Sequence, residues 1–439
     1  MALIVQKYGG SSLRGVARIR AVADRVSESY REGDTVVVVV SAVGGVTDHL
    51  LDTASHVSAD PDPRETDQLV ATGEQQSAAL AALALRACGV PAVSLTGGQA
   101  GIRVAGRHGA ARIQGIDPHP LRTCLQQGRV PVVAGFQGVR GDGATATIGR
   151  GGSDTSAAAI AAALRADWCE ICTDTAGVAT ADPRVSPAAR VQAAIPVDLM
   201  SELAWYGAKV IHPRAVELAE LHQVPMRVRA TSGRGAATTI GRRPLMRRLE
   251  DPATLTGIAH MKGLSCIRVT GREDDGHPMA DVLREMARQG IGVVGVTQSR
   301  SPLDEPLLEV LVDDSQFAVA TDAARLAFGG VGGCVSGETG LGAVSLVGVG
   351  LMSRPWYAAR MFGALHEAQI VVRAVATAQN RVTAVLGADD IEQAVRLVHD
   401  AFDSEDFGIT TERNGDDQDQ RELLADLEPG EEDSFIAAV

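Results

Sequence analysis

The stretch VQKYGGSSL, residues 5–13, follows a short apolar run and places a lysine directly before two glycines. Glycine-rich turns after strands often bind phosphate groups, because their backbone N–H groups can approach an anion closely. This stretch fits neither of the common phosphate-binding patterns, GxxxxGK[ST] and GxGxxG. The position of Lys7 ahead of Gly9 and Gly10 therefore points to a different arrangement of cation and loop.

Two further glycine-rich turns occur in the chain, SAVGGVTD (41–48) and GRGGSD (149–154), and each lies between a predicted strand and a predicted helix. In a parallel sheet such turns lie at the carboxyl edge, where ligands bind. A helix N-terminus adds about half a positive charge there. Three such turns at one edge, two of them with the cations Lys7 and Arg150, predict a site for an anionic ligand. A tight loop remains the alternative for any single turn.

Strand-like and helix-like segments alternate through the first half of the chain. TVVVVVSAVG (35–44) has the continuous β-branched run of a strand that is buried on both faces. The Ala- and Leu-rich segments 66–89 and 153–166 are typical of helices. The alternation predicts an α/β domain over residues 1–230, with a parallel-rich sheet sandwiched by helices.

The character of the sequence changes near residue 230. A Gly- and Arg-rich segment predicts a linker at 231–255. Two weaker repeats follow, each with the order strand, helix, strand, strand, helix, and they predict two α+β, ferredoxin-like modules at 256–340 and 341–403. Residues 404–439 are acidic and poor in apolar side chains, so we expect a largely disordered tail.

Composition limits the classes of partner and compartment. The formal net charge of −13 argues against a nucleic-acid partner, which requires a basic face. No stretch approaches the roughly 18 consecutive apolar residues of a membrane span, and Lys7 interrupts the N-terminal apolar run too early for a signal peptide. The six cysteines form no disulfide framework, and CEIC (169–172) lies on a predicted strand without a second CxxC pair. These features predict a cytoplasmic protein that binds no membrane, and they favour neither a metal nor a redox role for CEIC.

Six motifs together carry a specific resemblance. They are KYGGSS, SAVGGVTD, ATGEQQSAAL (71–80), GRGGSDTSA (149–157), CTDTAGVATADPRV (172–185) and YGAKVIHPRAVELA (206–219). Their order and spacing resemble those of the aspartate kinases, which belong to the amino-acid kinase superfamily and carry paired C-terminal ACT modules. The segment SLVGVG…AARMFGALHEA (345–368) is similar to an ACT module as well.

The resemblance implies transfer of the γ-phosphoryl group of ATP to the side-chain carboxylate of L-aspartate, which gives 4-phospho-L-aspartate. Catalysis of phosphoryl transfer consists mainly of positioning and charge neutralisation. Lys7 is then expected over the transferring group, with Gly9 and Gly10 donating hydrogen bonds to phosphates and Asp154 orienting Lys7. The alternatives are a surface lysine and an aspartate that only caps its helix. No general base is required, because the nucleophile is already a carboxylate.

The resemblance also implies a pocket for aspartate. Arg150 can hold a carboxylate with two hydrogen bonds. Glu74 resembles the glutamate that binds the ammonium group in this family, although a carboxylate near a helix N-terminus is an alternative explanation. The hydroxyl groups of Ser41, Thr47 and Ser153 are expected to complete the pocket.

ATP binding is assigned by the same resemblance to four residues: Thr173, Asp174, Arg184 and Lys209. The two cations are expected on the phosphates and the acid near the adenosine. Mg²⁺ is expected to be carried by ATP with few protein ligands, so no protein metal site is predicted. The family turn usually reads close to TDVDGVYTADPR, whereas here Ala176 replaces an acid and Ala179 an aromatic residue. These two changes put the affinity for the nucleotide in question.

The ACT modules imply lysine or threonine as an effector and a homodimer or larger homo-oligomer. Asp274 and Gln298 match positions where the family often contacts its effector. Two turns depart from the family pattern, since DDGH (274–277) replaces Asp-Lys-Pro-Gly and Pro355–Trp356 replaces Pro-Gly. We therefore expect feedback inhibition by lysine or threonine to be weakened or lost.

The leading hypothesis is an aspartate kinase that supplies lysine, threonine and methionine synthesis or a specialised branch of that pathway. One alternative is an amino-acid kinase for another carboxylate. The other is a regulatory subunit with feeble catalysis. The presence of Lys7, Glu74, Arg150 and Asp154 together favours an active enzyme over a regulatory subunit.

Overall fold

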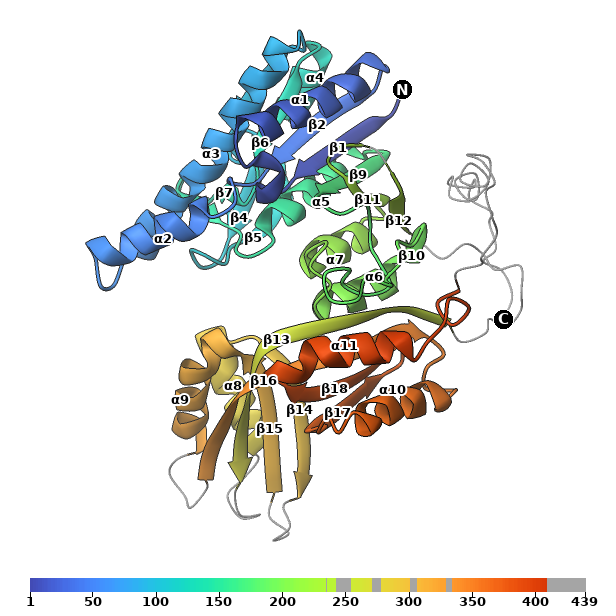
Figure 1. Cartoon of the computed structure of the whole chain (residues 1–439). Coiled ribbons are helices and arrows are strands. Elements are labelled where there is room, and N and C mark those ends of the chain that lie inside the picture. Colours follow the sequence, from blue (N-terminus) through green and yellow to red (C-terminus); the bar gives the residue numbers. More distant parts are fainter. Residues whose placement is uncertain (234, 242–253, 271–277, 301–305, 329–333, 409–439) are drawn as a thin grey trace, which may run out of the picture.

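The computed structural model describes residues 1–233, 235–241, 254–270, 278–300, 306–328 and 334–408. Figure 1 shows two parts, an N-terminal domain (residues 1–241) and a C-terminal domain (residues 254–408) below it. Asp274, the turn at 274–277 and most of the expected acidic tail lie outside the described residues.

An eight-stranded sheet forms the centre of the N-terminal domain, with the order β10-β12-β11-β9-β1-β2-β6-β3. Its strand pairs are parallel except for β11 with β12. The strands are β1 (Leu3–Tyr8), β2 (Thr35–Val40), β3 (Ala92–Leu95), β6 (Val130–Ala134), β9 (Trp168–Thr173), β10 (Ala194–Pro196), β11 (Met226–Ala230) and β12 (Ala237–Gly241).

Helices cover both faces of this sheet (Figure 1), as the sequence predicts. In β2, Val37 and Val39 join one hydrophobic core while Val36, Val38 and Val40 join the other. The valine run therefore exists because β2 is buried on both faces. The helices are α1 (Val16–Arg31), α2 (Val46–Val57), α3 (Pro63–Ala87), α4 (His119–Gln126), α5 (Gly152–Leu164), α6 (Val197–Trp205) and α7 (Pro213–Leu221), with the 3-10 helix η1 (Gly10–Leu13).

A second sheet of four strands holds the third glycine-rich turn. Its order is β5-β4-β7-β8, from β4 (Ile102–Ala105), β5 (Arg112–Ile116), β7 (Gln137–Val139) and β8 (Thr145–Thr147). The prediction that all three glycine-rich turns follow strands of one parallel sheet is therefore wrong, because GRGGSD follows β8. Phe136, with φ +68°, directs the chain out of the main sheet after β6, and the N–H group of Ile148 donates to its carbonyl oxygen at 2.8 Å. This bond holds the start of the GRGGSD turn beside the end of β6, a strand of the main sheet.

The C-terminal domain is built on one six-stranded sheet with the order β14-β15-β13-β16-β18-β17. The strands are β13 (Thr254–Thr270), β14 (Val293–Arg300), β15 (Pro306–Asp313), β16 (Cys334–Val349), β17 (Ala374–Ala378) and β18 (Arg381–Gly387). The helices are α8 (Pro278–Gln289), α9 (Phe317–Phe328), α10 (Trp356–Glu367) and α11 (Ile391–Asp400), with the 3-10 helices η3 (Asp314–Gln316) and η4 (Ala388–Asp390). Two separate hydrophobic cores, one with α8 and α9 and one with α10 and α11, match the two expected α+β modules.

The two modules are interleaved rather than consecutive. β13 and β16 pair antiparallel over almost their whole length, so the first part of β13 (254–262) lies against the last part of β16 (342–349) in the second module. The expected division at 340/341 thus omits a strand of the second module, because one long strand serves both. The linker expected at 231–255 also begins later, since β12 (Ala237–Gly241) pairs with β10 and β11 in the N-terminal sheet.

None of the helices within the described ranges combines the length and apolar character that crossing a membrane requires.

Arg381 links the two domains. Its Nε donates to Glu202 Oε2 on α6 at 3.2 Å, and its guanidinium lies 3.7 Å from the centre of the Tyr206 ring. Arg381 is buried, while Glu202 is partly exposed. A buried guanidinium with these partners stabilises the contact through both the ion pair and the aromatic ring.

We predict that Arg381→Ala lowers the free energy of unfolding by about 2 kcal/mol, because Glu202 loses its partner and the Tyr206 ring its cation. Urea unfolding monitored by circular dichroism measures the change. Arg325→Ala is the matched control, since Arg325 forms an exposed pair with Asp322 on α9 and such pairs contribute about 0–1 kcal/mol. Equal losses in the two variants would contradict the importance of this domain contact.

Candidate active site

Lys7 and Asp154 form a short ion pair at the carboxyl edge of the main sheet. Lys7 is near the end of β1, and its Nζ lies 2.6 Å from Asp154 Oδ1 in the first turn of α5. The two side chains are only 13% and 11% exposed. Lys7 is therefore not a surface lysine. Asp154 does not cap its helix either, because Gly151 is the N-cap residue and no side chain caps this helix.

The second oxygen of Asp154 is also occupied. The backbone N–H of His212 donates to Asp154 Oδ2 at 3.1 Å. A Cβ atom on Gly151, which has φ +66°, would lie 1.9 Å from the His212 ring. Glycine is thus required at this position by both its backbone angle and its close contact, and the turn is fixed against the segment before α7.

The first two glycine-rich turns lie against each other. A Cβ atom on Gly10 would lie 2.6 Å from the Ala42 carbonyl oxygen and 2.9 Å from the Gly44 nitrogen. The Gly44 N–H donates to the Gly10 carbonyl oxygen at 3.1 Å. A Cβ atom on Gly9 would lie 3.4 Å from Lys7 Nζ. The backbone of both turns can therefore approach a group bound beside Lys7.

Glu74 is a buried carboxylate with one free oxygen. It is 3% exposed in the interior of α3, well after the helix begins at Pro63, so the explanation as a carboxylate near a helix N-terminus is wrong. Oε1 accepts the N–H of Ala42 at 2.9 Å, whereas Oε2 has no hydrogen-bond partner among the described residues. Burial raises the pKa of Glu74 to about 7, and the Ala42 hydrogen bond opposes this only in part. Such an oxygen is suited to bind a cation.

The three expected hydroxyl residues lie around the same edge. Ser41 follows β2 directly, and its N–H donates to the Tyr8 carbonyl oxygen at 3.1 Å. Thr47 is half-buried in the first turn of α2. Ser153 is buried at the start of α5, close enough that a Cβ atom on Gly135 would lie 3.0 Å from it.

Arg150 is in the same turn as Asp154, but its side chain is exposed to solvent. Its side chain is 83% exposed, and Nη1 lies 3.8 Å from Asp313 Oδ2 at the end of β15 in the C-terminal domain. An exposed pair at this distance contributes little stability. The guanidinium is therefore free to exchange this carboxylate for another one.

The four residues expected to bind ATP lie in β9 and the segments that follow it. Thr173 ends β9, and its hydroxyl donates to Asp174 Oδ1 at 3.1 Å. Asp174, Arg184 and Lys209 are exposed, and Arg184 Nη2 lies 2.7 Å from Asp182 Oδ2. Gln298, expected at the effector site, is exposed on β14.

The two cysteines of CEIC cannot act together. Cys169 and Cys172 belong to the cores on opposite faces of the main sheet. Burial raises the pKa of both thiols, that of Cys172 to about 12. Within the described residues, no group of histidine, cysteine or acidic side chains is placed to hold a metal ion.

Two backbone groups that sequence reasoning missed complete the site. The N–H groups of Ala42 and His212 orient Glu74 and Asp154. Backbone donors have no residue type of their own, so only the three-dimensional fold reveals them.

Comparison with known proteins agrees with this geometry. Residues 2–230 match the model of the amino acid kinase family, and residues 344–402 match an ACT domain model. The fold and the site thus define a kinase of the amino acid kinase class with a regulatory-type C-terminal domain. The chain is 40% identical over 408 residues to the aspartokinase of Geobacillus stearothermophilus, which covers 92% of this chain and 97% of that relative. The chain belongs to the aspartokinase family.

Solved structures show the same fold. E. coli aspartokinase III in complex with aspartate and ADP, in the R-state, has a TM-score of 0.76 and 24% identity, and the match covers 91% of this chain and 99% of that chain. The same enzyme with lysine and aspartate, in the T-state, has a TM-score of 0.65 at 24% identity, with 91% and 100% covered. The fold class and the family inferred from the six motifs are confirmed.

The raised pKa of Glu74 predicts a loss of stability with rising pH. The folded protein keeps a proton on Glu74 up to about pH 7, whereas the unfolded chain releases it near its ordinary pKa of about 4.5. Stability therefore falls between these values and is lowest above pH 7, by up to about 3 kcal/mol. We predict that Glu74→Gln is more stable than wild type at pH 8 and loses this advantage at pH 4.5. Urea unfolding at both pH values measures the difference.

Glu65→Gln provides the control, since Glu65 is an exposed glutamate on the same helix. We expect the free energy of unfolding of this variant to follow that of wild type at both pH values. A wild type and a Glu74→Gln variant with parallel stability profiles from pH 4.5 to 8 would contradict the raised pKa.

Proposed function

We propose that this chain transfers the γ-phosphoryl group of ATP to the side-chain carboxylate of L-aspartate and releases ADP and 4-phospho-L-aspartate. The observation that carries the proposal is the buried Lys7–Asp154 pair beside two glycine-rich turns, with Glu74 presenting an unpartnered oxygen near the second turn. A cation, backbone N–H groups and a buried acid together suit a phosphate donor and an ammonium-bearing acceptor.

The aspartate substrate carries one ammonium group and two carboxylates. Glu74 Oε2 accepts from the ammonium group, which also removes the cost of a buried carboxylate without a partner. Arg150 leaves its weak pair with Asp313 and holds the carboxylate that does not react. The hydroxyl groups of Ser41, Thr47 and Ser153 complete the pocket.

The reaction requires no proton transfer to the nucleophile. An oxygen of the side-chain carboxylate attacks the γ-phosphorus, the bond from phosphorus to the β,γ-bridging oxygen breaks, and the electron pair leaves with ADP. Lys7 neutralises charge on the transferring oxygens, and Asp154 keeps the ammonium group of Lys7 in place. Gly9 and Gly10 bring backbone N–H groups toward the phosphates.

On the nucleotide side, the proposal assigns Thr173 and Asp174 to the nucleoside and Arg184 and Lys209 to the phosphates. Mg²⁺ enters with ATP, and its charge adds to that of Lys7. Because Arg184 is paired with Asp182 in the structure, nucleotide binding has to break or share this pair. ATP and free aspartate are cytoplasmic metabolites, so the proposal places the reaction there.

The product is an acyl phosphate that supplies lysine, threonine and methionine synthesis or a specialised branch. The ACT modules would bind an amino-acid effector such as lysine or threonine, with Gln298 as a contact. Assembly into a homodimer or larger homo-oligomer is part of the proposal, since β14 and β17 leave both edges of the C-terminal sheet open.

A hydroxamate assay with ATP, Mg²⁺ and L-aspartate tests the proposal. We predict that Lys7→Ala lowers kcat by about a hundred- to a thousandfold, because the transferring phosphoryl group loses its preorganised cation. Lys262→Ala is the control, since Lys262 forms an exposed pair with Glu392 in the C-terminal domain. Circular dichroism verifies that both variants are folded. A Lys7→Ala enzyme with near-normal turnover would refute the assignment, and faster turnover of glutamate or acetylglutamate by wild type would favour a kinase for another carboxylate.

The same assay measures feedback control. Because the turns at 274–277 and 355–356 depart from the family pattern, we predict that lysine, threonine and both together leave most of the activity at concentrations that saturate a sensitive aspartokinase. Complete inhibition by either amino acid at low concentration would contradict this prediction.

A further inference from the structure

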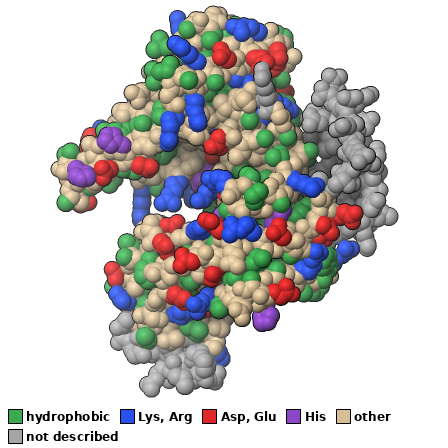
Figure 2. Space-filling view, in the orientation of Figure 1, with side chains coloured by type: hydrophobic (Ala, Val, Ile, Leu, Met, Phe, Trp, Pro, Cys, Tyr) green, Lys and Arg blue, Asp and Glu red, His purple; other side chains and the backbone are tan. Residues whose placement is uncertain are grey.

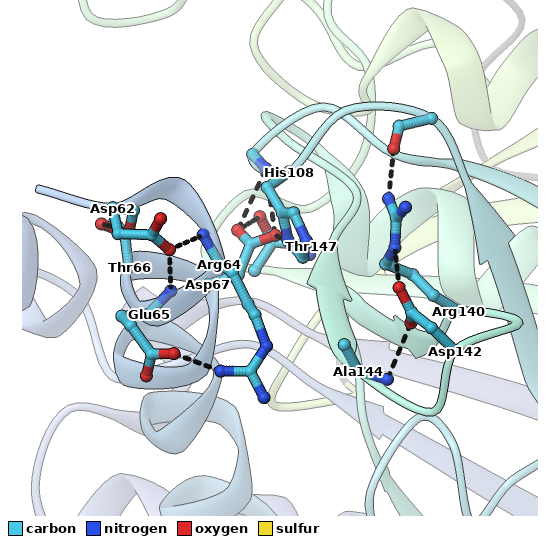
Figure 3. Close-up of polar contacts among 12 residues, drawn as sticks. Asp62, Arg64, Glu65, Thr66, Asp67, His108, Arg140, Asp142, Ala144 and Thr147 are labelled. Carbon is cyan, nitrogen blue, oxygen red and sulfur yellow. Dashed lines mark hydrogen bonds and ion pairs between the residues drawn. The ribbon is translucent and has the colours of Figure 1, made fainter.

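Asp67 is a buried carboxylate that has no place in the reaction described above. It lies on α3 and is only 2% exposed. Figure 3 shows it between His108 and Thr147. His108 Nδ1 donates to Oδ2 at 2.6 Å, and the N–H of Gly109 donates to both oxygens at 3.0 and 3.1 Å. Thr147 donates its N–H to Oδ2 at 3.0 Å and its hydroxyl to Oδ1 at 2.6 Å.

These donors come from the end of β8, which leads to Arg150, and from the loop between β4 and β5. Thr147 ends β8, and Arg150 follows three residues later. The carbonyl oxygen of Thr147 accepts the N–H of Ala111 at 2.9 Å, so all of its polar groups are held. A Cβ atom on Gly149, two residues after Thr147, would lie 3.0 Å from the Gly109 carbonyl oxygen. Asp67 thus fixes the end of β8 and the loop between β4 and β5, which packs against the start of the Arg150 turn.

Glu74 is on the same helix, seven residues after Asp67. Seven residues make nearly two helical turns, so both carboxylates lie on one face of α3, about 10 Å apart along its axis. α3 therefore holds the ammonium-binding acid directly and the carboxylate-binding arginine through Asp67 and Thr147. α3 therefore positions the groups at both ends of the proposed substrate pocket.

We propose that Asp67 is a positioning residue that sets the distance between Glu74 and the turn of Arg150, and thereby the length of the amino-acid substrate that fits. This inference rests on the proposed function. A carboxylate suits this place because both of its oxygens accept backbone N–H groups, those of Gly109 and Thr147. An asparagine would present an NH₂ group to at least one of them, and the turn would shift. Misplacement of a positioning group by about 1 Å can reduce the rate by about a hundredfold.

The experiment measures kcat and both Michaelis constants of Asp67→Asn with aspartate and with glutamate. We expect the KM for aspartate to rise by about ten- to a hundredfold, the KM for ATP to stay unchanged, and the ratio of kcat/KM for glutamate over aspartate to increase. A loss of stability alone would not raise the KM for aspartate while leaving the KM for ATP unchanged, nor would it change the kcat/KM ratio of the two amino acids.

Asp62→Asn is the matched control. Asp62 caps the same helix, since its Oδ1 accepts the N–H groups of Arg64 at 2.9 Å and Glu65 at 3.1 Å, and these bonds stay within the first turn of α3 (Figure 3). It is expected to lose stability with unchanged Michaelis constants. Thr147→Val removes only the hydroxyl donor and is expected to raise the KM for aspartate. Thr147→Ser keeps this donor and is expected to have the wild-type KM for aspartate. The Thr147 pair decides the question if Asp67→Asn does not fold.

The inference is overturned if Asp67→Asn and Thr147→Val keep the wild-type KM for aspartate, if both KM values rise together, or if Asp62→Asn reproduces the effect. These outcomes leave the proposed function intact as long as wild type phosphorylates aspartate. A wild-type protein without activity on aspartate overturns the proposed function and this inference with it.

Discussion

The ion pair between Lys7 and Asp154 is the contact on which the arrangement of the site depends. Lys7 belongs to β1, which lies between β2 and β9 in the main sheet, whereas Asp154 begins a helix that follows a strand of the second sheet. Two charges so far removed from water are costly unless they are paired. The 2.6 Å contact therefore joins the glycine-rich turns at the edge of one sheet to the GRGGSD turn that follows the other. Figure 2 shows lysine and arginine side chains gathered where the two domains meet, which suits anionic ligands.

The sequence indicated candidate residues for this site, but it did not reveal which strands and contacts hold them in place. The valine run identified β2 because a doubly buried strand requires apolar side chains at every position. Lys7, Glu74 and Asp154 could be proposed because the motifs that contain them resemble those of the aspartate kinases and their residue types suit the chemistry. The sequence did not reveal that GRGGSD follows a second sheet, because that depends on the φ of +68° at Phe136 after β6, and a phenylalanine rarely adopts it. Nor did it reveal Asp67, although an acid seven residues before Glu74 in a helical segment was a signal of a shared face. The interleaved modules were missed because each half of a long strand has the pattern of a separate strand.

The 172–185 segment and the C-terminal domain are physically connected. Thr180, in the turn that departs from the family pattern, lies 2.9 Å from His399 Nε2 on α11, and its carbonyl oxygen accepts the N–H of Ile258 on β13 at 2.7 Å. Arg150 contacts the same domain through Asp313. A movement of α11 or β15 would thus reach the 172–185 segment through Thr180 or the GRGGSD turn through Arg150.

A structure with ADP and L-aspartate bound tests the central claim most directly. The account predicts that the ammonium group of aspartate lies about 3 Å from Glu74 Oε2, that its non-reacting carboxylate has displaced Asp313 from Arg150, and that the β-phosphate lies beside Lys7 and Gly10. Aspartate bound away from Glu74, or a nucleotide whose phosphates lie out of hydrogen-bond reach of Lys7, would contradict it.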